Sequence, residues 1–321
     1  MQFLRRIGID TYMLLLVAMV CAGGLLPARG QVAAGLHHLT FWAVALLFLL
    51  YGAKLDLASI RAGLMNLRLQ AACLATTYAL FPALGLALSV LLRPVLGPEL
   101  ATGLLFLSVL PSTVQSAIAF TGIAGGNVAA AICAASISNL LAVGLTPALM
   151  ALLMERSGGI STDAVGRIAV QILLPFVLGQ MLRPWIGAAI RRQRLLTLVV
   201  DRGSILMIVY AAFSAGTVAG IWTAIPPFTL LALGLTVAGF MALVMAAMAA
   251  GGAAAGLPMP DRRALFFCGS TKSLASGLPI ATALFPPAVL GAVVLPVMLF
   301  HLGQLLVCAV IAQRAAQAQA A

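Results

Sequence analysis

Residues 266–279, FFCGSTKSLASGLP, surround a single lysine, Lys272, with small and hydroxyl-bearing side chains. The residue types predict a polar binding segment that interrupts a helix, because ammonium and hydroxyl groups bind anions and carbonyl oxygens. Lys272 could hydrogen-bond to carbonyls and hydroxyls, lose its proton through desolvation, or meet an anionic ligand. The candidate ligand-binding residues here are Ser270, Thr271, Lys272, Ser273 and Ser276, and the candidate helix breakers are Gly269, Gly277 and Pro279.

A second polar interruption occurs in residues 104–127, LLFLSVLPSTVQSAIAFTGIAGGN. Proline removes one backbone donor and clashes with the preceding helical turn, so Pro111 predicts a break. Carbonyls freed at bilayer depth are tolerated only where protein or a water-filled cavity satisfies them. An ordinary proline kink, with hydroxyls bonded back to the helix, is the alternative. The candidate site residues that follow the proline are Ser112, Thr113, Gln115 and Ser116.

The next apolar segment adds Ser136, Ser138 and Asn139. Ser136 and Asn139 are three residues apart, so they share one face of a helix and can reach one neighbour. Packing between small residues of neighbouring helices is the alternative for the serines.

Composition indicates where these segments lie. Of the 321 residues, 63% are apolar and 8% are charged, and the mean hydropathy is +1.14. A soluble domain carries about a quarter charged residues, so the chain is expected to be an all-α polytopic membrane protein. Apolar runs of about 20 residues, each able to cross a bilayer, predict ten spans near 11–27, 39–55, 69–92, 99–124, 127–153, 168–186, 201–221, 227–255, 264–285 and 290–312.

The net charge of +11 comes from short basic clusters between the apolar runs, which is typical of a topology signal rather than a nucleic-acid site. With both termini cytoplasmic, most basic residues, Arg202 among them, fall in cytoplasmic segments. This predicts a multi-pass protein of the inner membrane, with the first apolar segment retained as a helix rather than cleaved as a signal peptide.

A division near residue 160 leaves five predicted spans in each half. An odd number inverts the second half relative to the first, which predicts inverted repeats over 1–160 and 161–321. Ser112-Thr113 and Ser270-Thr271 support this, because both pairs differ by the same offset (270 − 112 = 271 − 113 = 158).

Other chemistries find little support in the sequence. The five cysteines lie in apolar segments without CxxC spacing, which does not predict a metal site or a disulfide framework. Motifs of hydrolases, zinc proteases and nucleotide-binding loops are missing, and no acidic residue falls in the middle of a predicted span. We therefore expect neither an enzyme nor a resident cofactor.

Three segments, 52–69, 110–147 and 266–279, resemble the bile acid:sodium symporter family, in particular its bacterial SBF-like branch. The resemblance implies panel and core domains, unwound fourth and ninth helices that cross near the membrane centre, and alternating access. It also implies a sodium ion, if one binds, near Ser116, Asn139, Ser270 and Ser273. The acidic residue that sodium-coupled relatives carry before the Ser-Gly-Leu of the ninth span is absent here.

We therefore expect a secondary transporter for a small amphipathic organic anion. Sodium is the candidate coupling ion. Its partners would be that anion and the lipid bilayer, and not nucleic acid. One alternative is a proton-linked or uncoupled anion carrier in which Lys272 replaces the cation. Another is a membrane regulator of the same fold that does not transport.

Overall fold

The computed structural model describes residues 11–54, 66–155 and 169–320, and these residues are almost entirely helical. Seven helical stretches are long and apolar enough to cross a membrane, which makes the chain a polytopic membrane protein. They are Gly30–Ala53, Leu67–Ser108, Val128–Met154, Val170–Ile190, Thr197–Val218, Pro227–Ala254 and Pro287–Ala318.

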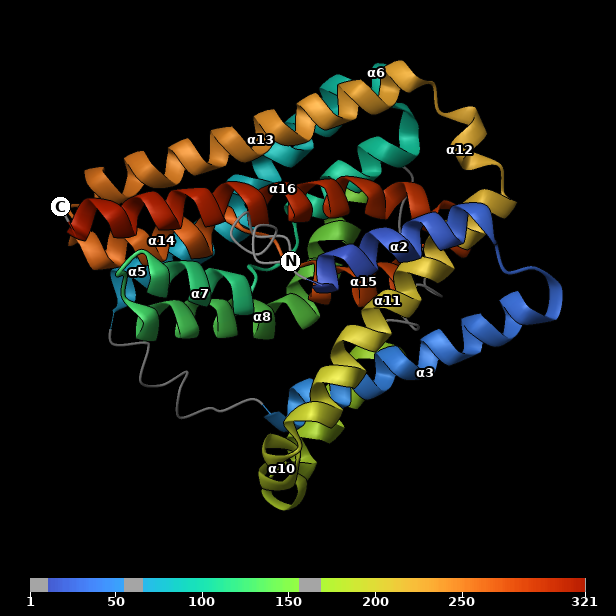
Figure 1. The fold of residues 1–321 in the computed structure, drawn as a ribbon, viewed down its shortest axis with the longest axis horizontal. Coiled ribbons are helices and arrows are strands. Elements are labelled where there is room, and N and C mark those ends of the chain that lie inside the picture. The colour runs from blue at the N-terminus through green and yellow to red at the C-terminus, as the bar shows by residue number, and fades with distance from the viewer. Residues whose placement is uncertain (1–10, 55–65, 156–168, 321) are drawn as a thin grey trace.

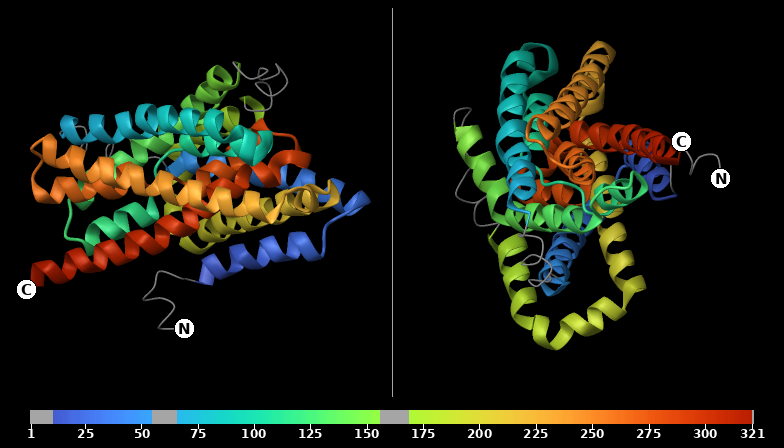
Figure 2. Two further views of the ribbon diagram at one scale, coloured as in Figure 1. Left: turned by 90° about the horizontal axis from the view of Figure 1, so that it is seen from above. Right: turned by 90° about the vertical axis from the view of Figure 1, so that its left-hand side faces the viewer.

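Four long helices form one group, which we call the four-helix group. Helix α10 packs on α3, and α11 packs on both α2 and α3. Figure 1 shows these helices in the right-hand and lower part of the molecule, and in the right-hand view of Figure 2 α10 and the adjoining part of α11 extend below the rest. The group consists of α2 (Thr11–Leu25), α3 (Gly30–Lys54), α10 (Leu174–Arg192), which the short π-helix η2 (Ala169–Leu173) precedes, and α11 (Arg194–Val218).

The remaining helices form a second group, which we call the broken-helix group; the short α12 (Ile221–Ala224) leads into it from α11 (Figure 1). Helix α16 packs on α6, α13 and α15, and it also contacts α11 of the four-helix group. The members are α5 (Leu67–Ala75), the π-helix η1 (Thr76–Leu80), α6 (Phe81–Ser108), α7 (Gln115–Ile123), α8 (Val128–Glu155), α13 (Pro227–Ala254), α14 (Met259–Ser270), α15 (Leu274–Leu284) and α16 (Pro287–Ala320).

Helix α6 contains a sharp change of direction at Gly97, whose φ of 80° and ψ of 168° are not helical. A positive φ of this size favours glycine, because a Cβ would be strained there. Pro98 follows and starts the next helical segment with its fixed φ. The two predicted spans near 69–92 and 99–124 therefore meet at this bend.

Two non-helical segments interrupt the broken-helix group. The first lies between the end of α6 at Ser108 and the start of α7 at Gln115, and the second lies between Ser270 and Leu274. They contact each other directly: the N–H of Ser273 donates to the carbonyl of Pro111 at 2.8 Å. We call this meeting of the two segments the crossing.

The structure corrects three of the predicted helix breakers. Pro111 lies in the first interruption, but Gly269 lies inside α14, and Gly277 and Pro279 lie inside α15. The two glycines provide space instead, because an added Cβ would come within 2.5 Å of Met248 Sδ at Gly269 and within 2.6 Å of a Leu110 methyl at Gly277.

The second interruption is held by a side-chain amide from α16 rather than by glycine or proline. The Gln304 Oε1 accepts from the N–H of Lys272, and its Nε2 donates to the carbonyl of Lys272, both at 2.8 Å. This amide satisfies both backbone groups of one unwound residue, as a neighbouring strand would.

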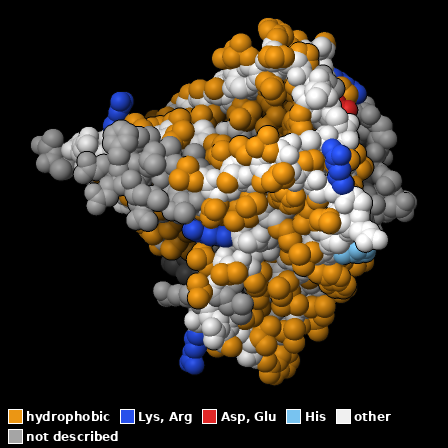
Figure 3. Space-filling view, turned by 45° about the vertical axis from the view of Figure 1, so that its right-hand side comes forward, with side chains coloured by type: hydrophobic (Ala, Val, Ile, Leu, Met, Phe, Trp, Pro, Cys, Tyr) orange, Lys and Arg blue, Asp and Glu red, His pale blue; other side chains and the backbone are white. Residues whose placement is uncertain are grey.

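The outer surface carries the apolar side chains that a bilayer requires. In Figure 3 hydrophobic atoms cover much of the visible face, and the Lys and Arg side chains are scattered singly over it. Large exposed apolar residues occur on many helices, including Leu91, Leu231 and Trp185. Such a surface is stable only against lipid, because water would hydrate it unfavourably.

Candidate functional site

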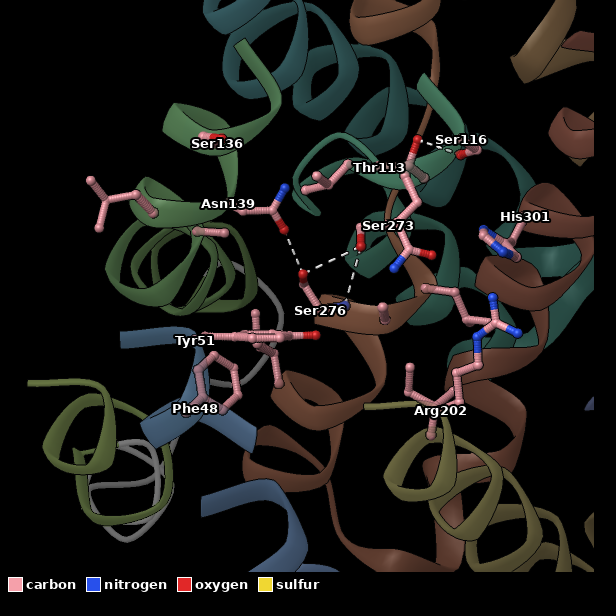
Figure 4. A pocket seen from close by; sticks show the side chains of 18 of the residues that line it. Phe48, Tyr51, Thr113, Ser116, Ser136, Asn139, Arg202, Ser273, Ser276 and His301 are labelled. Carbon is pink, nitrogen blue, oxygen red and sulfur yellow. Dashed lines mark hydrogen bonds between the residues drawn. The ribbon is translucent and has the colours of Figure 1, made fainter. Parts of the chain in front are cut away.

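A cavity of about 640 Å³ lies between the four-helix group and the crossing. Its walls come from both helix groups (Figure 4). A volume of this size is typical of a small-molecule site.

One wall of the cavity is polar and comes from the broken-helix group. The Ser116 hydroxyl donates to Thr113 Oγ1 at 2.8 Å, and the Ser276 hydroxyl donates to Asn139 Oδ1. Figure 4 shows these side chains clustered where α7, α8 and α15 approach one another. The predicted site residues that line the cavity are Thr113, Gln115, Ser116, Ser136, Asn139, Ser273 and Ser276.

The opposite wall is largely apolar and aromatic. Phe48 and Tyr51 of α3 project towards the polar wall (Figure 4), and Leu16, Phe176 and Ile205 from the other helices of the four-helix group complete this surface. A ligand that fills the cavity would therefore contact polar atoms on one side and hydrocarbon on the other.

Two helices begin at the polar wall. The first residues of α7, Gln115 and Ser116, line the cavity, as do the first residues of α15. The N-terminal end of a helix carries about half a positive charge, and its first N–H groups lack helical acceptors. Both helix ends therefore favour a negatively charged group in the cavity.

Among the described residues that line the cavity, Arg202 carries a full charge, although its position in the sequence had predicted a place in a cytoplasmic segment. Helix α11 begins at Arg194, earlier than the predicted start at 201, so Arg202 lies about two turns inside the helix. Its guanidinium carbon lies 4.9 Å from the centre of the Tyr12 ring. The apolar run LLTLVV before Asp201 is the sequence signal that could have revealed this placement.

His301 of α16 lies close to Arg202 at the same end of the cavity (Figure 4). Its Nδ1 is 2.9 Å from Nε2 of Gln304, the residue that holds the second interruption. A cationic group and an imidazole thus face the cavity from α11 and α16, on opposite sides of the boundary between the two helix groups.

Lys272 lies on the other side of the crossing and does not line the cavity. Its side chain is 1% exposed. Its ammonium donates to the carbonyls of Leu110 at 2.6 Å, Ser108 at 2.8 Å and Thr77 at 3.1 Å. These contacts match the first of the three roles that the sequence left open, hydrogen bonding to carbonyls.

The predicted site residues Ser112, Ser138, Thr271 and Ser270 do not line the cavity either, and the first three hydrogen-bond within or across the crossing. Thr271 Oγ1 is 3.2 Å from Ser112 Oγ and 3.0 Å from Thr113 Oγ1. Ser138 Oγ accepts from the N–H of Ser112 at 3.0 Å. The Ser270 hydroxyl donates to the Phe266 carbonyl of its own helix, away from the cavity.

Of the four residues expected near a sodium ion, Ser116, Asn139 and Ser273 line the cavity, and Ser270 does not. Ser270 bonds within its own helix, and the Asn139 amide nitrogen donates to the Ser112 carbonyl at 2.8 Å. Sodium prefers several oxygen ligands, and its attraction is strongest for carboxylates. Among the described side chains, the carboxylates are Glu99, which is exposed and lines a different cavity, and Asp261.

Asp261 is occupied elsewhere. Its two oxygens accept from the amide nitrogens of Asn66 at 2.7 Å and Asn127 at 2.8 Å. Those asparagines in turn accept from the N–H groups of Leu69 and Ala130 at the starts of α5 and α8. The buried carboxylate thus ties two helix starts together and is not available to the cavity.

Comparison with known proteins agrees with the architecture. Residues 10–317 match the SBF-like CPA transporter family. An uncharacterized protein of Pseudomonas aeruginosa is 46% identical over 96% of this chain and 93% of its own length. The protein named "Putative symporter YfeH" of Escherichia coli is 44% identical over 95% of this chain and 92% of its own length.

A vertebrate relative is more distant. Sodium/bile acid cotransporter 7 of Rattus norvegicus is 27% identical over 97% of this chain and 94% of its own length. The membrane-spanning helices, the two interrupted segments and the match over nearly the whole sequence lead to one conclusion: this chain belongs to the SBF-like CPA transporter family.

Proposed function

We propose that the protein carries a small amphipathic organic anion across the inner membrane by alternating access. The observation that carries this proposal is the position of Arg202 in a cavity that two helix N-termini also face. A guanidinium is always charged and binds carboxylate or sulfonate groups bidentately. The apolar wall around Phe48 and Phe176 would receive the hydrocarbon part of the same molecule.

The proposed transport cycle requires ten spans in two inverted repeats, 1–160 and 161–321. The repeat makes Thr113 and Thr271 equivalent (271 − 113 = 158), and their Oγ1 atoms lie 3.0 Å apart. Equivalent residues meet in this way when they lie near a two-fold axis. The repeat also makes α2 equivalent to α10 and α3 equivalent to α11. The observed packing of α2 on α11 is then equivalent to the packing of α10 on α3.

The boundary between the helix groups is where movement would open the cavity. In our proposal the four-helix group, as a panel, moves against the broken-helix group, as a core, with both termini in the cytoplasm. Arg202 belongs to the first group, and the polar wall belongs to the second. An anion that contacts both groups would therefore favour the arrangement in which they are closed around it.

The first experiment uses taurocholate, an amphipathic organic anion of the class named in the rat relative. We expect it to raise the melting temperature (Tm) of the purified protein in potassium salts, because it binds only the folded state. Arg202→Gln should weaken the apparent affinity by about 10–100-fold, since a hydrogen bond to a charged group contributes about 1.5–3 kcal/mol.

The control is Arg314→Gln, which removes an exposed arginine near the end of α16 and should leave the affinity unchanged. Uptake of labelled taurocholate into proteoliposomes should fall in parallel with binding. Equal affinity in Arg202→Gln and wild type, or stabilisation by octylammonium but by neither taurocholate nor octanoate, would contradict the proposal.

A further inference from the structure

The carbonyl groups of the first interruption all have identified donors. From Ser108 to Ser112, the α6 helix has ended and its last carbonyls have no helical partner. Lys272 supplies donors to Ser108 and Leu110, the N–H of Ser273 serves Pro111, and side chains of α8 serve the other two. Those α8 donors are Thr146 Oγ1, to Val109, and Asn139 Nδ2, to Ser112.

A third carbonyl for Lys272 comes from the π-helix η1. The N–H of Phe81 bonds to Thr76, as the wider π turn requires, and the Thr77 carbonyl accepts from Lys272. A π turn of this kind is uncommon and often marks a functional position. Carbonyls of η1, of the last residue of α6 and of the first interruption thus accept from a single nitrogen.

The geometry around this nitrogen is that of a bound monovalent cation. Three acceptors at 2.6, 2.8 and 3.1 Å match the three N–H donors of an ammonium group. A neutral amine has two such donors and would direct its lone pair at one of the carbonyls. The ring of Phe81 covers the remaining side with its centre 4.0 Å from Nζ, which is a cation–π contact.

The charge of the Lys272 ammonium is offset by the backbone rather than by a carboxylate. The two carboxylates whose side chains the structure describes are Asp261, bound to two asparagines, and the exposed Glu99. Lys272 instead sits at the C-terminal end of α6, which carries a partial negative charge. Phe81 also packs against Phe240 and Phe300, so the surroundings are apolar and strengthen this attraction.

We propose that the Lys272 ammonium is a built-in cation that organises the crossing and makes it independent of any bound external cation. The ammonium takes the place that a free monovalent cation would need to fill for the two interruptions to pack together. Because Lys272 lies outside the cavity, this role is separate from anion recognition by Arg202. The role of Lys272 therefore does not depend on the identity of the substrate.

The proposal predicts that removal of the side chain creates a cation site. Lys272→Ala keeps the carbonyls of Thr77, Ser108 and Leu110 but leaves a space lined by them. We expect its Tm in N-methyl-D-glucamine chloride, whose cation is too large to enter, to lie about 5–15 °C below that of wild type. Methylammonium, ammonium, potassium or sodium at equal ionic strength should restore about 3–5 °C in a concentration-dependent way.

The matched control is Lys272→Met, whose thioether fills the space without a charge. Its Tm should fall, and none of the small cations should restore it. The wild-type protein provides a measurement that does not depend on any variant folding: its Tm should be equal in N-methyl-D-glucamine, sodium and potassium chloride.

Three results would overturn the proposal. The first is a Lys272→Met variant as stable as wild type, because the ammonium would then be dispensable. The second is a folded Lys272→Ala variant whose Tm no small cation raises. The third is a wild-type protein that loses stability when sodium and potassium are both replaced, because the crossing would then need an external cation.

Discussion

At the scale of single residues, the crossing is held by polar side chains that bond to unwound backbone. The Asn139 side chain makes three hydrogen bonds: it donates to the carbonyls of Ser112 and Ala135 and accepts from Ser276. Ser136, three residues earlier on α8, donates to the Ile132 carbonyl of its own helix. The two residues thus share a helix face and line one cavity but differ in what they hold.

This difference gives a prediction for two neighbouring substitutions. Asn139→Ala leaves the Ser112 carbonyl without its donor, which should lower the free energy of unfolding by about 1–3 kcal/mol. Ser136→Ala removes a hydrogen bond to the Ile132 carbonyl, which already belongs to the same helix. The free energy of unfolding should therefore change by less than about 0.5 kcal/mol. Tm measurements on both variants test this, and equal losses would show that Asn139 does not hold the crossing.

At the scale of helices, close contact between α3 and α10 depends on glycine residues, which have no side chain. A Cβ on Gly52 would overlap the carbonyl oxygen of Phe176, and a Cβ on Gly179 would overlap that of Leu49. Small residues allow helix backbones to approach closely in membranes, where packing rather than hydrophobicity drives association. The four-helix group therefore depends on glycine at these two positions.

The prediction at this scale compares two glycines on the same helix. Gly52→Ala should destabilise the protein by about 1–3 kcal/mol, because the backbone of α10 must move away. Gly35→Ala has open space around its Cβ and should be neutral or slightly stabilising, since alanine favours a helix. Thermal unfolding in detergent measures both, and a stable Gly52→Ala variant would show that the two helices can separate without cost.

At the scale of the whole molecule, the cavity lies on the boundary between two helix groups, so their relative position controls access to it. Ser116 lines the cavity and is partly exposed, whereas Thr121, on the same helix α7, is fully buried. Four of the five cysteines are buried, and Cys21 is exposed, so a Cys21→Ser background removes the accessible native thiol.

Thiol labelling in sealed vesicles tests whether access alternates. In that background, Ser116→Cys should react with a membrane-impermeant maleimide supplied to either side, and taurocholate should slow the reaction. Thr121→Cys should not react under the same conditions. Reaction of Ser116→Cys from one side only would mean that the cavity keeps one orientation, as expected of a regulator and not of a carrier.

The sequence alone determined the membrane class, because apolar runs of this length are stable only in lipid, and it located both interruptions through their polar residues. It placed the second break less well, since Gly269 and Pro279 proved to lie inside helices. Helix starts were also displaced: α3 begins at Gly30 rather than 39, because small and polar residues can extend a helix beyond its apolar run.

Only the tertiary structure decided which charge faces which partner. Lys272 lies between Thr271 and Ser273, and Arg202 lies between Asp201 and Gly203; these sequence neighbours do not say where each cationic side chain points. The fold directs Lys272 to carbonyls of residues 77, 108 and 110, and it turns Arg202 into the cavity. The reason is physical: orphan carbonyls and helix N-termini arise only where separate helices end, and the distances between those ends are set by packing of the whole chain.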